Sequence, residues 1–275
     1  MCTVSVIPMC DAQPFLARGV AERDGVSTAA GFRLVMNRDE SRSRPAGLTP
    51  SVFELPSGQS AVWPTDPAGG GTWVGANQSG VALALLNIYS QAPGVPRPSD
   101  AGMRAPTSRG MLIPALIDAG RAPDVAARLT RVDLGAFRPF RLICADAVSV
   151  FECRWDGLAL SIADCPMGPC CFSSHGWGDR FARPRLELFR SWFAARPLSA
   201  QEQDAYHRHR WSGRPATSVR MAREESRTVS ITSIDVAADG EVEMVHEALD
   251  SGAEETRVRL TPVAGPAAPR AGALA

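Results

Sequence analysis

Cys2 carries two groups that together could form a nucleophile and its base. It follows Met1, and an initiator methionine is normally removed before a residue as small as cysteine. Residue 2 would then hold a thiol with a reference pKa of about 8.5 and an α-amine with one of about 7.7–8.0. The amine could accept the thiol proton, as it does for N-terminal threonine nucleophiles. This pair predicts acyl transfer, in which the thiolate attacks an acyl carbon and the amine passes the proton to the leaving group.

Three further polar side chains could assist such a nucleophile. Arg38, in the Asn-Arg-Asp-Glu motif at 37–40, is a fixed positive charge that would favour thiolate over thiol. Asp39 could hold and orient the α-ammonium group. Asn87 ends the apolar run 80–87 and could donate its amide to an oxyanion, an interaction typically worth about 2.7–4 kcal/mol of barrier. The alternative for the motif is a charged strand end that caps a turn.

The elements around these residues are predicted to bring them together. Residues 2–8 are β-branched and end at a proline, which is typical of a strand, and residues 29–36 predict a second strand. A polar, Gly-containing turn at 18–27 would join the two as a hairpin. In an antiparallel pair the start of one strand lies beside the end of the other. The hairpin therefore predicts that Cys2 lies next to the motif at 37–40.

The rest of the pattern predicts separate groups of strands and helices. Residues 72–77 and 80–87 form a strand pair around a turn, and the apolar second run indicates burial on both faces. Residues 91–107 hold four prolines and predict a loop or lid. Further expected elements are short strands within 52–63, strands at 139–145, 148–154 and 158–163, helices at 108–119, 123–130 and 179–195, and a hairpin of 227–236 with 241–247. This order predicts α+β layers in a single domain over 1–262, followed by a disordered tail at 263–275.

Composition excludes several classes of function. The 29 basic and 29 acidic residues balance, so general binding of nucleic acid by excess positive charge is not expected. Every basic residue is Arg, which excludes Schiff-base and phosphate-loop chemistry based on Lys and is typical of a G+C-rich bacterial genome. No charged leader precedes an apolar run and no stretch of about 18 apolar residues exists, so neither a signal peptide nor membrane insertion is expected. Seven cysteines without a secretory signal predict reduced thiols in the cytoplasm.

Two other groups of residues, one of cysteines and one of histidines, are not expected to form functional sites. Cys165, Cys170 and Cys171 lack the paired spacing of a zinc site, so they are expected to be buried or incidental thiols and no metal is predicted. His207 and His209 lie in a polar stretch, for which a solvated helix face is the expectation.

The order of the motifs resembles one known family. The chain is similar to the NRDE family, also called the Transport and Golgi organisation protein 2 family, over most of residues 1–235. The matching segments are Cys2, Asn37-Arg38-Asp39-Glu40, Arg44-Pro45-Ala46, Gly70-Gly71-Thr72-Trp73-Val74-Gly75-Ala76-Asn77, Ser108-Arg109-Gly110, Pro139-Phe140-Arg141-Leu142 and Ser226-Arg227-Thr228-Val229-Ser230. Several motifs recur at compatible spacing, which makes the resemblance specific.

The family is in turn similar to N-terminal nucleophile hydrolases of the bile-salt hydrolase and penicillin V acylase type. This resemblance implies a four-layer αββα sandwich, with two antiparallel sheets between helical layers. It implies catalytic roles at Cys2, Arg38, Asp39 and Asn87. Ser174 stands where the family has a second catalytic Asn, and the distal Arg of the acylases corresponds to Arg223 or, less well, to Arg227.

The same comparison suggests which residues would contact substrate. These are Asn37, Trp73, Asn77 and His175, although His175 could equally be a surface residue. A hydroxyl at Ser174 donates one hydrogen bond but cannot reproduce the donor and acceptor geometry of an amide, which weakens the case for efficient amide hydrolysis.

Two functions of different classes follow. The first is an N-terminal-cysteine amidohydrolase or acyltransferase that acts on the C–N bond of a small acylated molecule and needs no cofactor. The second is a non-catalytic protein that binds or traffics haem or an acyl lipid, because eukaryotic members of the family are linked to haem trafficking and lipid homeostasis. Thiolate can ligate haem iron, but no haem motif is present in the sequence. The site decides between the two, since a fold alone does not determine function.

Overall fold

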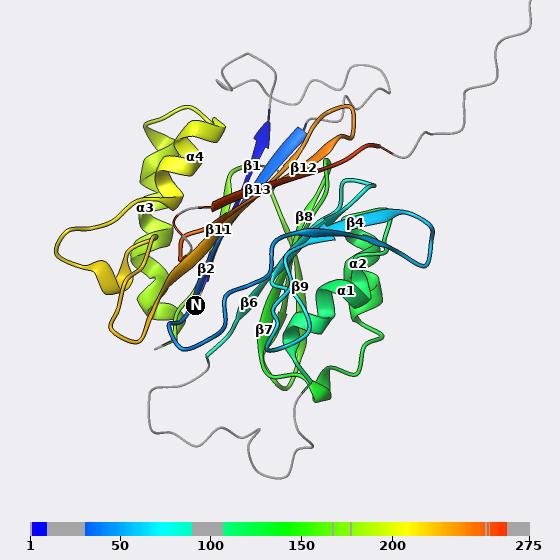
Figure 1. Cartoon of the computed structure of the whole chain (residues 1–275), viewed down its shortest axis with the longest axis horizontal. Helices are drawn as coiled ribbons and strands as arrows, with labels where there is room; N and C mark the ends of the chain where they lie inside the picture. The colour runs from blue at the N-terminus through cyan, green and yellow to red at the C-terminus, as the bar shows by residue number, and fades with distance from the viewer. Residues whose placement is uncertain are drawn as a thin grey trace, which may run out of the picture.

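Two antiparallel sheets form the centre of the molecule (Figure 1). The computed structural model describes residues 2–9, 31–89, 107–166, 168–176, 178–250, 252 and 254–262. The first sheet has six strands in the order β10 (Cys170–Ser174), β1 (Cys2–Met9), β2 (Gly31–Ser41), β11 (Ser226–Val236), β12 (Val242–Ala248) and β13 (Glu254–Leu260). β1 therefore lies inside the sheet, with both of its edges paired.

The second sheet follows the chain order. Its seven strands are β3 (Ser51–Glu54), β4 (Ser60–Trp63), β5 (Val74–Asn77), β6 (Ala82–Asn87), β7 (Phe140–Ala145), β8 (Val150–Trp155) and β9 (Leu160–Cys165). Each strand pairs antiparallel with the next. β6 is buried along most of its length, as its continuous apolar run predicted.

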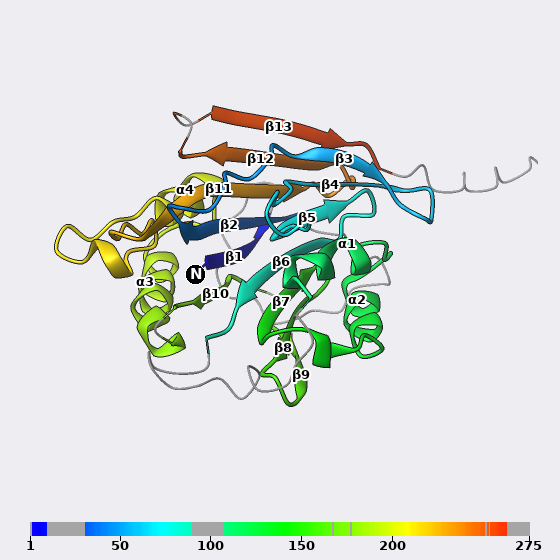
Figure 2. The ribbon, with the colours of Figure 1, turned by 60° about the horizontal axis from the view of Figure 1, so that its bottom comes forward.

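Helices cover the outer face of each sheet, as Figure 2 shows. The first sheet is covered by η4 (Asp179–Ala182), α3 (Arg183–Ala194) and α4 (Ala200–His207), and the second by η2 (Arg109–Met111), α1 (Leu112–Leu116) and α2 (Ala122–Leu129). Two short 3-10 turns, η3 (Leu134–Ala136) and η5 (Pro215–Thr217), complete the described elements. The layers are thus helix, sheet, sheet and helix, which confirms the predicted αββα sandwich. In the described part of the chain, no helix is long and apolar enough to span a membrane.

Three apolar clusters match the three interfaces between layers. The largest lies between the sheets and includes Val4, Leu34, Val74 and Ile234. A second joins β6 to β8 with α1 and α2, and a third, smaller cluster joins Ile7 of β1 to α3 and α4. Because side chains alternate between faces along a strand, residues 4 and 6 of β1 face the other sheet while residues 5 and 7 face the helices.

Most predicted elements are confirmed, with differences at particular places. Cys2 pairs with Arg38 across β1 and β2, so the predicted hairpin neighbours are correct, but β2 continues through the Asn-Arg-Asp-Glu motif to Ser41. The predicted helix 108–119 is a 3-10 turn followed by the shorter α1. The predicted turn at 18–27, nearly all of the loop at 91–107 and the tail at 263–275 lie outside the described residues.

Three elements are not visible in the sequence pattern. α4 has no apolar stripe, and its start is set by Ser199, whose Oγ accepts a hydrogen bond from the Glu202 N–H at 3.2 Å. β10 is a five-residue strand that forms by pairing with β1. β13 is a largely exposed edge strand. β10 depends on a partner distant in the chain, whereas β13 pairs with the adjacent β12. Local periodicity does not report pairing of either kind.

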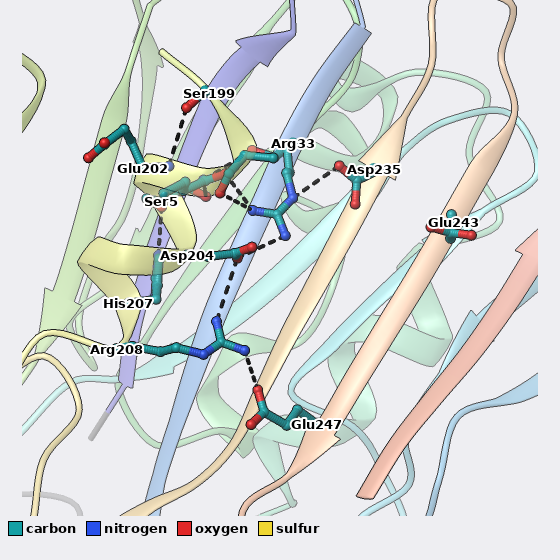
Figure 3. A network of polar contacts seen from close by, with 12 residues as sticks. Ser5, Arg33, Ser199, Glu202, Asp204, His207, Arg208, Asp235, Glu243 and Glu247 are labelled. Carbon is teal, nitrogen blue, oxygen red and sulfur yellow. Dashed lines mark hydrogen bonds and ion pairs between the residues drawn. The ribbon is translucent and has the colours of Figure 1, made fainter. Parts of the chain in front are cut away.

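Arg33 on β2 attaches α4 to the first sheet (Figure 3). Its side chain is 7% exposed and forms ion pairs with Asp204 of α4 at 2.9 Å and with Asp235 of β11 at 3.0 Å. Arg33 also donates to the Ala200 carbonyl and to Gln203 Oε1, each at 3.3 Å. The guanidinium thus contacts groups from two elements, α4 and β11, and its removal leaves carboxylates that are only about one-third exposed.

We expect Arg33→Met to destabilise the protein by about 2 kcal/mol or more. This is below the roughly 3–5 kcal/mol for a fully buried pair, because both carboxylates retain some contact with water. The free energy of unfolding in urea measures the effect. Arg208→Met is the matched control: Arg208 contacts Asp204 and Glu247 in the same network but is 45% exposed, and its loss should cost less than about 1 kcal/mol. Equal effects of the two substitutions would contradict this role for Arg33.

Candidate active site

Cys2 lies in the middle of a row of residues across the first sheet. It is opposite Arg38 of β2 on one side and Ser174 of β10 on the other. The Cys2 backbone N–H donates to Ser174 Oγ at 3.2 Å, and the Cys2 carbonyl accepts from Ser173 Oγ at 3.2 Å. Strand pairing and these two bonds fix the backbone on which the thiol stands.

The thiol of Cys2 borders a polar cavity of about 480 Å³. Five of the residues predicted for the site lie in its lining, namely Cys2, Arg38, Asp39, Trp73 and Asn87. They come from β1, β2, the residue before β5 and the end of β6, so the cavity lies where the two sheets meet. Tertiary structure therefore brings together residues as far apart in the sequence as Cys2 and Asn87.

Two glycines allow the wall of this cavity to form. A Cβ on Gly71 would lie 2.3 Å from the carbonyl carbon of Gly110, a distance that no side chain tolerates. This close approach lets the Thr72 N–H donate to the Gly110 carbonyl at 3.0 Å and brings Arg109 to the lining. Gly71 and Gly110 are therefore required because a side chain at Gly71 would collide with the backbone of Gly110.

Arg38 is held over the ring of Trp73. Its guanidinium carbon lies 4.1 Å from the ring centroid, a cation–π distance. Glu40 and Asp66 lie 3.6 and 3.8 Å from Arg38 Nη2. A side chain that is 6% exposed and held by a ring and two carboxylates provides a fixed positive charge beside Cys2.

Asp39 faces away from Trp73, toward the helices. Its Oδ1 accepts from Thr228 Oγ1 at 2.6 Å, and its Oδ2 is 3.1 Å from Arg185 Nη1. Asp39 and Arg185 side chains are both fully buried, and the same Arg185 nitrogen donates to Thr3 Oγ1 at 2.9 Å. The Asp39–Arg185 pair therefore ties β2, β11 and α3 to β1 one residue from the candidate nucleophile.

The surroundings keep the Cys2 thiol protonated. Burial raises the pKa of Cys2 most, the positive N-terminus lowers it, and the negative charge of Asp39 raises it. The resulting pKa lies above the ordinary value, so little thiolate exists at neutral pH. A reaction at Cys2 therefore needs a base that removes the proton as the bond forms.

Asn87 is the predicted residue best placed to contact a substrate. It ends β6, is partly exposed, and lies in the cavity lining. Its Nδ2 donates to Tyr89 Oη over 3.4 Å, which is a long hydrogen bond. The amide can therefore exchange this contact for one with a bound oxygen at small cost.

The prediction that Asn37 and Asn77 contact substrate is wrong. Asn37 Nδ2 donates to the carbonyls of His207 and Val219 at 2.8 and 3.0 Å, and Oδ1 lies 2.8 Å from His207 Nδ1. Asn77 donates to two carbonyls near the end of α1 and accepts from two backbone N–H groups of its own turn. Both amides are fully buried with these partners, so both residues are structural.

The structure places Ser174, His175 and Arg223 beside the cavity but not in the lining formed by described residues. His175 is buried, and its Nε2 contacts Arg223 Nη2, which also donates to the Ala216 carbonyl at 2.8 Å. Burial and the charge of Arg223 lower the pKa of His175 to about 3, so its imidazole is neutral. His175 is therefore not a surface residue, and substrate contact by His175 stays a prediction, as does a catalytic role for Arg223.

Sequence reasoning missed two buried polar residues next to the site. Arg185 precedes Phe189 and Trp192 by four and seven positions, so a helical projection could have placed it on the apolar face of α3. His207 was expected on a solvated face, but it is fully buried, and its Nε2 lies 2.7 Å from Ser5 Oγ. That expectation was wrong because the sheet covers this side of α4.

The six cysteines in the described ranges are free thiols.

The fold combines two antiparallel sheets, flanking helices and a cysteine on an internal strand. Residues 26–157 match the family model described as Transport and Golgi organisation 2. This match agrees with the resemblance of the motifs to that family. No curated protein has a significant sequence match to the chain.

Three solved structures illustrate the similarity of fold. Penicillin V acylase from Agrobacterium tumefaciens is 12% identical, with 93% of this chain and 85% of that chain covered and a TM-score of 0.48. The Caenorhabditis elegans ortholog of N-acylethanolamine-hydrolyzing acid amidase is also 12% identical, with 84% and 92% covered and a TM-score of 0.48. A C2A mutant of conjugated bile acid hydrolase from Clostridium perfringens is 9% identical, with 96% and 100% covered and a TM-score of 0.47. Similarity at this level transfers no chemistry to this chain.

The contacts of Asn37 and Asn87 predict that the same substitution destabilises the protein to different extents. Asn37→Ala should destabilise the protein by about 3–5 kcal/mol, because it leaves two carbonyls and a His207 nitrogen without partners in a buried region. Asn87→Ala should cost less than about 1 kcal/mol, since it removes one long bond at a partly exposed position. Urea denaturation of the two variants measures the difference. A marginal effect of Asn37→Ala would contradict its structural assignment.

Proposed function

We propose that the protein is an N-terminal-cysteine hydrolase or acyltransferase that cleaves the C–N bond of a small acylated molecule. The observation that carries this proposal is the position of Cys2, which borders a polar cavity together with Arg38 and Asn87. The mechanism requires that Cys2 becomes the N-terminal residue, so that its α-amine is free. The family match and the internal position of β1 are consistent with this role.

The proposed reaction has two halves. Cys2 Sγ attacks the acyl carbon while its proton passes to the α-amine, and the carbonyl oxygen becomes an oxyanion. The C–N bond then breaks, the leaving amine takes the proton from the α-ammonium group, and a thioester remains on Cys2. Water completes hydrolysis by attacking the thioester, and an acceptor amine or alcohol completes acyl transfer instead. The raised pKa of Cys2 makes the amine necessary as a base.

Neighbouring residues supply positioning and charge in this proposal. Asn87 Nδ2 donates to the oxyanion. Ser174 Oγ, which accepts from the Cys2 nitrogen at 3.2 Å, holds the amine in place after processing. Arg38 stabilises developing negative charge. Asp39, bound by Arg185, is a positioning residue that keeps β2 in register and adds negative charge near the ammonium group.

The lining of the cavity favours a polar substrate. Seven of its sixteen described lining residues are charged, namely four arginines and three carboxylates: Arg38, Arg44, Arg109, Arg138, Asp39, Glu40 and Asp66. A haem or an acyl lipid would need a largely apolar pocket. The alternative of a haem or lipid carrier therefore gains no support from this cavity.

Substitution of the nucleophile tests the proposal. Cys2→Ala and Cys2→Ser should each lower kcat/KM on a panel of small N-acyl amides by about 10³-fold or more. Cys170→Ala is the matched control, because Cys170 lies on β10 outside the cavity lining and its loss should leave kcat/KM unchanged. Thermal unfolding of all three variants reports whether the fold survives. Equal turnover by wild type and Cys2→Ala would refute the mechanism.

The state of the N-terminus provides an independent test. Intact mass, before and after treatment with a thiol reagent, should show a mature chain that begins at Cys2 and is modified first at this residue. A native protein in which residues before Cys2 are fully retained would contradict the mechanism, because the α-amine would then be an amide.

Asn87→Ala should lower kcat far more than it raises KM. One oxyanion donor is worth about 2.7–4 kcal/mol of barrier, or roughly 10²–10³ in kcat. Steady-state kinetics on the best amide of the panel separates the two parameters. A change in KM alone would place Asn87 in ground-state binding and remove it from the oxyanion site.

A further inference from the structure

A second cavity lies on the other side of the Arg38–Trp73 pair. It has a volume of about 300 Å³, and Arg38 and Trp73 line both this cavity and the one at Cys2. Ser230 and His246 also border it, from β11 and β12. Two stacked side chains therefore form the partition between the candidate active site and a neighbouring space between the sheets.

The strand register relates this space to the nucleophile. Cys2 is opposite Arg38, and Arg38 is opposite Ser230, so the three residues form one row across β1, β2 and β11. Paired residues point to the same face, and neighbouring strands are about 4.8 Å apart. Cys2 and Ser230 are therefore separated by two strand spacings, about 10 Å, on the face that meets the second sheet.

A β-bulge directs Ser230 to this face. Thr228 is opposite Asp39, and Ser230 is opposite Arg38, so two steps on β11 match one step on β2. Thr228 accordingly bonds Asp39 on the helix side, whereas Ser230 faces the space between the sheets. Without the bulge, both would lie on the helix side, because residues two apart share a face. Bulges that redirect a side chain are common next to active sites.

Two residues that line this cavity carry buried donors without partners. Among the described residues, neither Trp73 Nε1 nor Ser230 Oγ has a hydrogen-bond partner, although Trp73 is 7% and Ser230 4% exposed. An unsatisfied buried polar group typically costs about 1–3 kcal/mol. Two such groups beside the Arg38 guanidinium form a set of donors that suits a hydrogen-bond acceptor with negative charge.

The other titratable groups that line the cavity are neutral, paired or at its rim. His246 Nδ1 is 2.8 Å from Thr232 Oγ1, and burial together with Arg38 lowers the pKa of His246 to about 4, so the ring is neutral. Asp250 is paired with Arg227 at 2.5 Å. Glu254 is exposed on β13. Negative charge thus lies at the exposed rim, and the donors lie inside.

We infer that this second cavity is a subsite for a carboxylate on the acyl chain of the substrate. Ser230 and Trp73 donate to the carboxylate, and Arg38 supplies the opposite charge while its other side faces the reacting centre. The inference rests on the proposed function in that the bound molecule is an acyl compound positioned for attack by Cys2. It adds the substrate class, namely monoamides of short dicarboxylic acids.

The separation of about 10 Å sets the length of the first probe. An attack distance of about 3 Å and a hydrogen bond of about 2.8 Å leave roughly 4 Å for a straight acyl chain. A path around Arg38 is longer, so a six-carbon chain is suitable. The probe is the mono-anilide of hexanedioic acid, and its matched control is the anilide of hexanoic acid, which has a methyl group in place of the carboxylate.

Binding to the Cys2→Ala protein, measured by calorimetry, tests the subsite without any need for turnover. The acid probe should bind at least 10-fold more tightly than the methyl probe. Adding Ser230→Ala, or Trp73→Phe, which keeps an aromatic ring under Arg38 but loses the indole N–H, should reduce this preference at least 5-fold. Adding Ser233→Ala should leave it unchanged, because Ser233 is on the same strand but faces the helices.

Failure of the subsite differs from failure of the proposed function. Equal binding of the two probes, binding of neither, or a preference that survives both Ser230→Ala and Trp73→Phe would overturn the subsite. Turnover of the same probes by wild type is the separate test of hydrolysis. A carboxylate preference without turnover would support the subsite and count against the hydrolase. Turnover without a preference would support the hydrolase and overturn the subsite.

Discussion

The register between β1 and β2 is the constraint on which the site depends. It places Cys2 opposite Arg38, so that thiol and guanidinium face the space between the sheets. A shift by one residue would turn every side chain of β1 to the opposite face and place Thr3 at the cavity. The apolar side chains of Val4, Val6, Leu34 and Met36 oppose such a shift, because all are buried in the core between the sheets.

The two faces of β2 divide the Asn-Arg-Asp-Glu motif between two purposes. Arg38 faces the cavity and stacks on Trp73. Asn37 and Asp39 face the helices, where one bonds His207 and the other Arg185. Half of the motif therefore builds the scaffold that holds the other half. A strand naturally makes this division, because its side chains alternate between faces.

Buried polar contacts replace apolar packing beneath the site. Arg185, Asp39, Thr3 and Thr228 form one connected set on the helix side of the first sheet. Such sets depend on geometry more than apolar contacts do, because an unpaired buried charge is costly. They are well suited to hold β1, β2 and β11 in a single arrangement next to a nucleophile that must be placed to within fractions of an ångström.

The sequence by itself determined the hairpin that brings Cys2 to the Asn-Arg-Asp-Glu motif, the strands around Asn87 and the layered α+β class, because local periodicity and turn residues encode these features. It did not determine the faces on which Asn37 and Asn77 lie, the burial of Arg185 and His207, or the pairing of β10 with β1. Each of these depends on contacts between residues far apart in the chain. The bulge at Thr228 and Ser230 is the clearest case, since it reverses the face of Ser230 only in the presence of its partner strand. Tertiary structure alone decided which polar residues meet at the cavity, because strand pairing over long sequence separations selects one face of each strand.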